Sequence, residues 1–333
     1  MQWRVMILVL ALFGAVPVPA TTQTACELTR PIVFAGLDYD SARFANAVAR
    51  RILQDGYGCR TDEIPGQAIP LLNGLARGDV DIIMEVWTAN PAAAWVDAEA
   101  AGKVVRLGVN FPDAREAWYV PRYLVEGANA KAAGLSNVVD LPKFKSVFAD
   151  PEEPGKGRFL NCPAGWQCEL INSKKLVAYG LADSFTNFRP GTGEALAAAV
   201  ESAMKRKRPI LFYYWGPTWL IGKYDLVALG EPAFDRTVWD DMLKSANPER
   251  ATAYPSSDVI IGANKAFAEK APIVAEFLKR YRTSNALVSE ALAYMREAGV
   301  EPDAAATHFL SEKPEVWHEW VPADVAVRVK AKL

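Results

Sequence analysis

Three tryptophans stand in short segments rich in Gly, Pro and Cys. They are Trp87 in MEVWTANP, Trp166 in NCPAGWQCE and Trp215 in FYYWGPTW. The face of an indole ring attracts a cation that cannot donate hydrogen bonds, such as a quaternary ammonium group, because the ring quadrupole is negative there. These residues predict a binding site for such a cation, although each ring taken alone could instead pack in a core.

The groups on which most enzymes depend are sparse. Only two histidines occur, His308 and His318, and both lie in the C-terminal part of the chain. The sequence has no phosphate-binding loop, dinucleotide fingerprint, nucleophile elbow or H-E-x-x-H motif. We therefore expect no metal, no cofactor and no histidine-dependent catalysis. A hydrolase that uses only carboxylates stays open, but no spacing singles out a pair.

Residues 1–25 have the pattern of a secretory signal peptide. Arg4 precedes an apolar run over residues 5–16, and small residues at positions 18–20 suit a signal peptidase. A membrane-spanning helix needs roughly 20 apolar residues, so this run is too short. Gln23-Thr24-Ala25 is a poor context for a lipoprotein cysteine at Cys26. We expect a periplasmic protein whose signal peptide is cleaved.

The charge of the chain argues against nucleic acid as a partner. The formal net charge is −2, so the chain lacks the excess of positive charge with which proteins bind a polyanion. The basic cluster at residues 205–208 ends an Ala-rich stretch, where cations suit the negative end of a helix. We therefore interpret it as a solvated helix end and expect a monomer that binds no nucleic acid.

Four cysteines in an exported chain are most simply two disulfides. Of the three possible pairings, spacing favours Cys26 with Cys59 and Cys162 with Cys168. The second would close a loop around Trp166. The chain-entropy model gives about 2 kcal/mol for this short loop and about 4 kcal/mol for the first, so positioning explains the short bridge better than stability does. Zinc is the competing interpretation, disfavoured because no histidine is near C-x5-C.

Alternating apolar strands and amphipathic helices predict an α/β fold with a mainly parallel sheet. Residues 31–35 form an apolar strand, and Phe44, Val48 and Ile52 recur at helical spacing after a proposed N-cap at Ser41. The further expected elements are strands at 60–64, 80–86 and 209–214, helices at 67–76, 167–179 and 192–205, and a mostly helical tail from 265.

Four segments resemble a known family in order and spacing. They are GDVDI at 78–82 running into Glu85-Val86-Trp87, CPAGWQCE at 162–169, FYYWGPTW at 212–219 and VIIGANK at 259–265. The family is that of the glycine betaine/proline betaine substrate-binding proteins of ABC importers. The likeness spans the mature chain, and the cysteine-bracketed Gly-Trp is its most specific element.

The resemblance implies a two-lobed periplasmic-binding-protein fold, the venus flytrap, with a ligand held between lobes and delivered to a membrane permease. We expect lobe 1 to comprise residues 26–115 plus 258–333 and lobe 2 residues 116–257. In the family, tryptophans at the places of Trp87, Trp166 and Trp215 surround a trimethylammonium group. Backbone amides at the places of Gln167 and Cys168 receive the ligand carboxylate, which suits a helix N-terminus.

Two departures from the family concern the ligand. Some members have a histidine where this chain has Pro91, so one polar contact to a ligand carboxylate is missing. The loop after the first strand also carries Asp38, Tyr39 and Asp40 at the edge where a parallel sheet binds its ligands. We expect Asp38 and Tyr39 in the site, and acid there would favour a net cation such as choline over a zwitterion.

Two other classes of function stay open. A ligand-sensing receptor on the same scaffold would bind the same solute but signal to a partner protein. An enzyme acting on choline-like compounds would need a base or a metal that the sequence does not reveal.

Overall fold

The computed structural model describes residues 25–89 and 91–333. The predicted signal peptide lies outside these residues, apart from Ala25. Within the described chain, no helix has the combination of length and hydropathy that crossing a bilayer requires.

The described residues alternate strands and helices, with a helical C-terminal part. The strands are β1 (Ile32–Leu37), β2 (Thr61–Gly66), β3 (Ile82–Trp87), β4 (Val104–Pro121), β5 (Gly157–Leu160), β6 (Phe185–Phe188), β7 (Leu211–Gly216), β8 (Leu226–Ala228) and β9 (Ser257–Asn264). The helices are α1 (Asp40–Asp55), α2 (Ala68–Arg77), α3 (Ala93–Ala100), α4 (Arg122–Val125), η1 (Val138–Phe144), α5 (Gln167–Ala178), α6 (Gly193–Lys205), α7 (Trp219–Lys223), α8 (Arg236–Lys244), α9 (Lys265–Lys270), α10 (Pro272–Arg280), α11 (Asn285–Ala298), α12 (Pro302–Glu312), α13 (Pro314–Trp317), η2 (His318–Trp320) and α14 (Ala323–Lys330).

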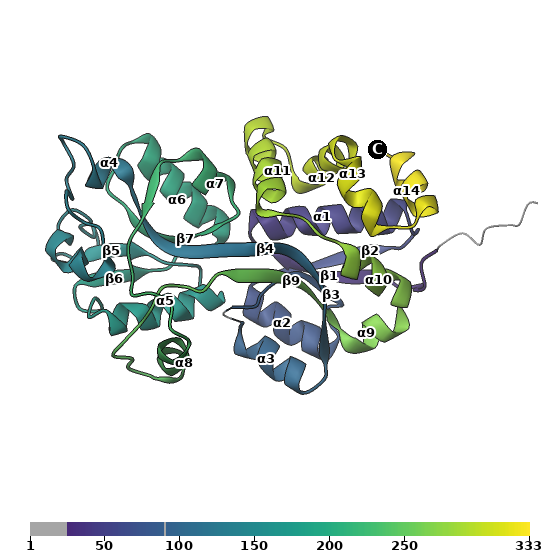
Figure 1. The fold of residues 1–333 in the computed structure, drawn as a ribbon, viewed down its shortest axis with the longest axis horizontal. Coiled ribbons are helices and arrows are strands. Elements are labelled where there is room, and N and C mark those ends of the chain that lie inside the picture. Colours follow the sequence, from purple (N-terminus) through teal and green to yellow (C-terminus); the bar gives the residue numbers. More distant parts are fainter. Residues whose placement is uncertain (1–24, 90) are drawn as a thin grey trace, which may run out of the picture.

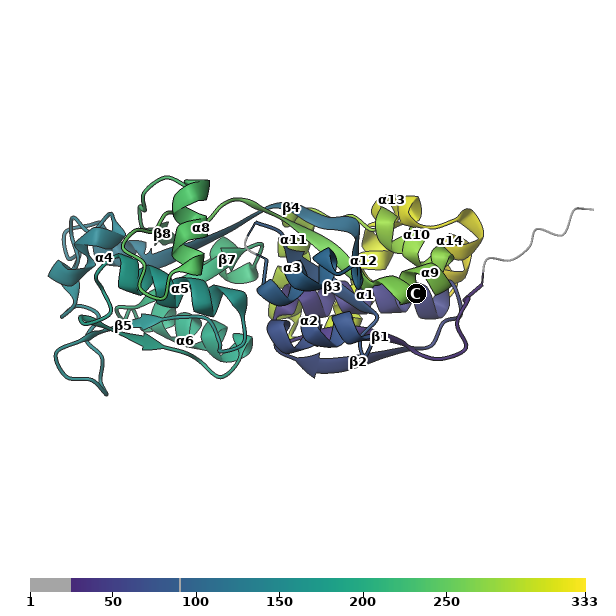
Figure 2. The same cartoon turned by 90° about the horizontal axis from the view of Figure 1, so that it is seen from below.

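Two halves lie side by side along the long axis of the molecule (Figures 1 and 2). We call the half with β1–β3, α1–α3 and α9–α14 lobe 1, and the half with β5–β8 and α4–α8 lobe 2. In lobe 1, α1 and α2 cover opposite faces of the sheet, and in lobe 2 α6 and α5 do the same (Figure 1). The predicted α/β, two-lobed fold is confirmed.

The sheet is mixed because the strands that cross between the lobes run against their neighbours. Its order is β2-β1-β3-β9-β4-β7-β5-β6, with β8 added beside β4. The outer strands of each lobe pair in parallel, as predicted, whereas β9 pairs antiparallel with both β3 and β4, and β7 antiparallel with β4. Each lobe therefore has parallel outer strands, and antiparallel crossing strands form the middle of the sheet.

Strand β4 belongs to both halves. Its residues up to Ala114 pair with β9, ending at Ser257, and its residues from Arg115 pair with β7. The chain thus passes between the lobes where β4 changes partner and where β9 begins. This change of partner supports the proposed boundaries near residues 115 and 257.

Helix α1 follows the predicted apolar spacing but not the predicted N-cap. Phe44, Val48 and Ile52 are all buried, and the ring of Phe44 packs edge to face on Phe309 of α12. The N-cap position is Tyr39, without a capping side-chain bond, and Ser41 lies within the first turn and is buried. The N-cap prediction for Ser41 is wrong because the loop after β1 is only two residues long, so the helix already begins at Asp40.

Both predicted disulfides are confirmed. Cys26–Cys59 ties the segment before β1 to the residue two before β2, and Cys162–Cys168 closes the loop between β5 and α5. The first bridge lies at the far side of lobe 1, away from lobe 2. The second lies at the lobe interface, directly around Trp166.

Candidate functional site

A cavity of about 80 Å³ lies between the lobes, and we call it the aromatic cavity. Its walls come from β3, the loop after β1 and α2 in lobe 1, and from α5 and β7 in lobe 2, with β4 between them. The lining residues are Tyr39, Ala68, Leu72, Ile83, Glu85, Val86, Trp87, Ala92, Glu116, Trp166, Gln167, Cys168, Tyr213 and Trp215. No Lys, Arg or His is among the described residues that line it.

Aromatic side chains from both lobes line the aromatic cavity. Tyr39 and Trp87 come from lobe 1, and Trp166, Tyr213 and Trp215 from lobe 2. The ring centroids of Trp166 and Trp215 lie 5.3 Å apart, and that of Tyr39 lies 5.0 Å from Trp166 and 5.9 Å from Trp215, all edge to face. Trp87 lines the same cavity and packs edge to face on Phe111 of β4. Such a ring set can present π faces to a cation from several sides.

The orientation of Trp166 is set by several contacts at once. Its indole Nε1 donates a 2.9 Å hydrogen bond to Asp38 of lobe 1. The loop that carries it turns at Gly165, whose φ of +90° is a conformation that L side chains rarely adopt. Gly193 of α6 lies so close that a Cβ there would be 3.1 Å from the ring. The Cys162–Cys168 bridge closes the same loop.

Asp38 does not line the aromatic cavity but accepts the hydrogen bond from Trp166. Besides Trp166, its carboxylate accepts hydrogen bonds from the Gln67 side chain at 3.0 Å and from the Gly193 amide at 3.3 Å. Trp166 and Gly193 belong to lobe 2, so the carboxylate joins the two lobes. Asp38 thus lies outside the lining of the aromatic cavity, where it positions Trp166.

The N-terminus of α5 faces the cavity. Gln167 and Cys168 are the first two residues of this helix and line the aromatic cavity, as the family resemblance implied. The first amides of a helix have no acceptor within it, and the helix dipole is positive at that end. This end can therefore receive an anionic group of a ligand.

Glu85 is a carboxyl group in the cavity wall that the sequence analysis did not single out as a site residue. It is 3% exposed, and neither Oε1 nor Oε2 has a partner in hydrogen-bonding geometry. Burial raises the pKa of Glu85 to about 8, although Ser41, Trp87 and Tyr39 lie close enough to lower it in part. One signal could have identified it, since strand alternation puts Glu85 on the same face as Trp87.

Glu116 is the second carboxyl group in the wall. It is 9% exposed and accepts a short hydrogen bond from the Tyr213 hydroxyl. Behind it in lobe 2 lies Lys175, which is fully buried, 2.5 Å from Glu231 and 4.1 Å from the centre of the Tyr254 ring. Burial lowers the pKa of Lys175, while the charge of Glu231 opposes this shift.

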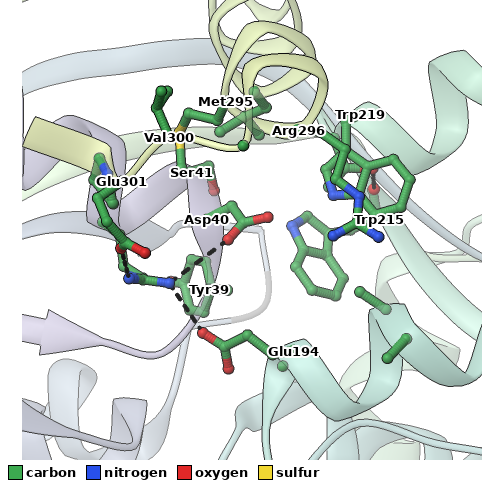
Figure 3. Close-up of a pocket in the computed structure, with 18 of the residues that line it drawn as sticks. Tyr39, Asp40, Ser41, Glu194, Trp215, Trp219, Met295, Arg296, Val300 and Glu301 are labelled. Atoms are coloured by element: carbon green, nitrogen blue, oxygen red, sulfur yellow. Dashed lines mark hydrogen bonds and ion pairs between the residues drawn. The ribbon is translucent and has the colours of Figure 1, made fainter. Parts of the chain in front are cut away.

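A larger hollow of about 380 Å³ adjoins the aromatic cavity, and we call it the cleft (Figure 3). Tyr39 and Trp215 line both spaces. Burial raises the pKa of Asp40 there. The charged side chains of the cleft pair mainly with one another, since Arg43 of lobe 1 lies 3.2 Å from Glu194 of lobe 2 and 3.1 Å from Glu301.

Trp219 also lies in the cleft and does more than pack. At 6% exposure it is buried. However, the guanidinium of Arg296 from α11 lies 4.7 Å from its ring centre, so it forms part of the contact between lobes (Figure 3). The charged side chains of the cleft thus make contacts within the protein, several of them between the lobes. The aromatic cavity is therefore the better candidate for a ligand site.

The structure brings most of the predicted site residues to one place. Trp87, Trp166, Trp215, Tyr39, Gln167 and Cys168 all line the aromatic cavity. Asp38 touches the ring of one of them, and Glu85, Glu116 and Tyr213 are additions to the predicted set. Contact of these residues with a ligand stays a prediction.

The sequence matches a family model. The substrate-binding domain of ABC-type glycine betaine transport systems matches residues 30–312. The glycine betaine/proline betaine-binding periplasmic protein of Escherichia coli (strain K12) is 30% identical over 209 residues, which are 61% of this chain and 61% of that protein. The chain therefore matches about three fifths of the length of this relative.

Solved structures share the fold at low sequence identity. A glycine betaine/L-proline-binding protein of an ABC transporter from Borrelia burgdorferi is 17% identical with a TM-score of 0.72, covering 90% of this chain and 100% of that one. An ABC-transporter choline-binding protein in complex with choline is 18% identical with the same TM-score, covering 92% and 98%.

Removing the Cys162–Cys168 bridge should weaken ligand binding more than it lowers stability. With both cysteines changed to serine, the loop that holds Trp166 gains freedom, while chain entropy predicts a loss of only about 2 kcal/mol. The matched control replaces Cys26 and Cys59, which should cost about 4 kcal/mol and leave the affinity of the folded protein unchanged. Urea unfolding and calorimetry with a quaternary ammonium ligand measure both. Normal binding by the first variant would refute a positioning role.

Asp38→Asn should weaken binding of choline and of glycine betaine by similar factors. The asparagine amide would face the donors of Gln67 and Gly193 and disturb the Trp166 contact, whatever the charge of the ligand. We expect about a three- to tenfold loss for each, as for the loss of a hydrogen bond of about 1 kcal/mol. Calorimetry with both ligands provides the comparison. A loss confined to choline would mean that the Asp38 charge reaches the ligand.

Proposed function

The chain belongs to the family of substrate-binding domains of ABC-type glycine betaine transport systems, and on this premise we propose that it captures a small quaternary ammonium solute for a membrane permease. The ligand class is that of glycine betaine, proline betaine and choline-like compounds. The observation that carries this proposal is the aromatic cavity, which five aromatic residues from both lobes line and no basic side chain of the described residues lines.

The aromatic rings suit the quaternary ammonium end of such a ligand. This group has no proton to donate, so hydrogen-bond acceptors gain little, whereas each desolvated aromatic face contributes about 1–2 kcal/mol. The faces of Tyr39 and the three tryptophans together then supply roughly 4–8 kcal/mol. Micromolar affinity requires about 8 kcal/mol. The remainder has to come from polar groups of the same cavity.

Two kinds of polar group are available, and they prefer different ligands. The amides of Gln167 and Cys168 at the start of α5 suit the carboxylate of a betaine. Glu85 and Glu116 suit a ligand with a net positive charge, such as choline. We propose that both ligand types fit the cavity by shape and that the carboxyl groups shift the balance towards the cation.

We further propose that the protein works in the periplasm after export. The sequence pattern at residues 1–25 supports a cleaved signal peptide, and the two disulfides are of the kind that persists in an oxidising compartment. Delivery to a permease follows from the family. A sensor on the same scaffold would share the binding step but not the permease.

A binding role agrees better with the cavity than catalysis does. The histidines lie elsewhere, since His308 stacks on Tyr294 of α11 and His318 lies beside Trp317. Among the described residues, no group of three or more His, Cys, Asp or Glu is arranged to hold a metal ion. The Ser41 hydroxyl, which interacts with Glu85, does not line the aromatic cavity.

Replacing Trp87, Trp166 or Trp215 by alanine should weaken binding of a quaternary ammonium ligand about tenfold or more. Phenylalanine should retain part of the affinity because it keeps a π face. The matched control is Trp317→Phe, which changes a buried tryptophan in the C-terminal helices. Calorimetry on folded variants should compare choline with its uncharged isostere 3,3-dimethylbutanol. If the neutral compound bound as well as choline, the cavity would recognise only shape and apolar surface.

The lobes should move apart without ligand and close around it. The described chain crosses between the lobes near Ala114 and Ser257, and the closing contacts, such as Arg43 with Glu194, are partly exposed ion pairs of little strength. Solution scattering with and without saturating choline or glycine betaine should give a smaller radius of gyration for the bound protein. An identical profile in both states would contradict hinge closure.

A further inference from the structure

Glu85 lies in a position that an ionised carboxylate rarely occupies. Its side chain is 3% exposed, lines the aromatic cavity and has both oxygens without a partner in hydrogen-bonding geometry. Ionising a buried carboxyl group costs free energy when no cation is near, so such a group stays protonated unless a cation binds beside it. No cation is among the groups that shift its pKa within the described chain.

The groups around Glu85 are neutral or acidic on every side. Tyr39 and Ser41 approach from the β1–α1 region and Trp87 from its own strand. The Tyr281 hydroxyl at the end of α10 also faces it, and Glu116 of β4 lines the same cavity. The approach of a positive charge would therefore be the largest available change in the electrostatics of this carboxyl group.

We propose that Glu85 is the residue that selects the charge of the ligand: it is protonated in the empty cavity and gives its proton to solvent when a quaternary ammonium cation without a carboxylate binds. This inference rests on the proposed function. The cation then replaces the proton as the partner of the carboxylate, and the wall of the cavity stays nearly neutral in both states.

A zwitterionic ligand would drive the same step less strongly. Its ammonium group favours the ionised form of Glu85, but its own carboxylate, held in the same small cavity, disfavours it. A protonated Glu85 could even donate a hydrogen bond to that carboxylate. Glycine betaine should therefore bind with little proton release, while choline should release close to one proton near neutral pH.

The pH dependence has a definite sign. Since burial raises the pKa of Glu85 to about 8, the carboxyl group is about 3% ionised at pH 6.5 and about three quarters ionised at pH 8.5. Binding of a cation that requires the ionised form should tighten about twentyfold over this range. Above pH 9 the affinity should level off.

The tyrosines and histidines of the described chain do not produce this profile. Tyr39 and Tyr213 have pKa values raised well above the usual value for tyrosine by burial, so they stay neutral. The pKa of Tyr281 is likewise raised. His308 and His318 do not line the cavity.

The experiment is calorimetry of choline and of glycine betaine at pH 6.5, 7.0 and 8.5 in buffers of different ionisation enthalpy. Wild-type protein should release close to one proton with choline at pH 7.0, and fewer than half a proton with glycine betaine. Glu85→Gln, which imitates the protonated form, should bind choline with one weak affinity at all three pH values. At pH 8.5 this affinity should be at least tenfold below that of the wild type.

A matched control and a ligand-free measurement complete the test. Glu290→Gln removes an exposed carboxyl group that pairs with Lys313 and does not line the cavity, so it should keep the wild-type pH profile. Without ligand, a carboxyl group with a raised pKa lowers stability as pH rises from about 4.5 to about 8. Glu85→Gln should lack this part of the decline in thermal stability.

The outcomes separate this inference from the proposed function. Choline binding with no proton release, or an unchanged pH profile in Glu85→Gln, would overturn the role of Glu85 and leave a quaternary ammonium binding protein. Absence of binding by the wild type to either ligand at every pH would overturn both.

Discussion

The hydrogen bonds of Asp38 are the interaction on which the site depends most. This carboxylate belongs to lobe 1 but accepts from the indole of Trp166 and the amide of Gly193 in lobe 2. The orientation of one cage ring is therefore tied to the relative position of the lobes. A ring that needed only local support would be equally well oriented in an open and in a closed molecule, whereas Trp166 gains this contact only when the lobes meet.

The aromatic cavity and the cleft beside it differ in how their charged groups are arranged. In the cleft, Arg43 and Arg296 meet Glu194, Glu301 and Glu201, so charges are matched within the protein. In the cavity, Glu85 faces aromatic and hydroxyl groups, and Glu116 accepts from a tyrosine. The protein thus pairs its charges where the lobes touch each other, whereas no cation of the described residues shifts the pKa of Glu85, where a ligand is proposed to bind.

Much of this arrangement could be predicted from sequence where local chemistry determines it. Helix α6 lies within the helix predicted at 192–205, and the spacing of the cysteines indicated both disulfides. The three tryptophans could be grouped because each stands in a distinctive segment. The roles of Asp38 and Glu85 could not be predicted, since the sequence does not show which carboxyl group already accepts hydrogen bonds from other side chains. The antiparallel crossing strands likewise depend on the path of the whole chain.

The division of the aromatic rings between the lobes has a consequence for release. Tyr39 and Trp87 move with one lobe and Trp166, Tyr213 and Trp215 with the other, so in an opened molecule each lobe retains only part of the aromatic wall. Loss of two aromatic faces corresponds to about 2–4 kcal/mol, a factor of about 30 to 1000 in the dissociation constant. A partner that opens the lobes would therefore release the solute without competing for its binding site. Opening removes aromatic contacts from the ligand and so lowers the affinity.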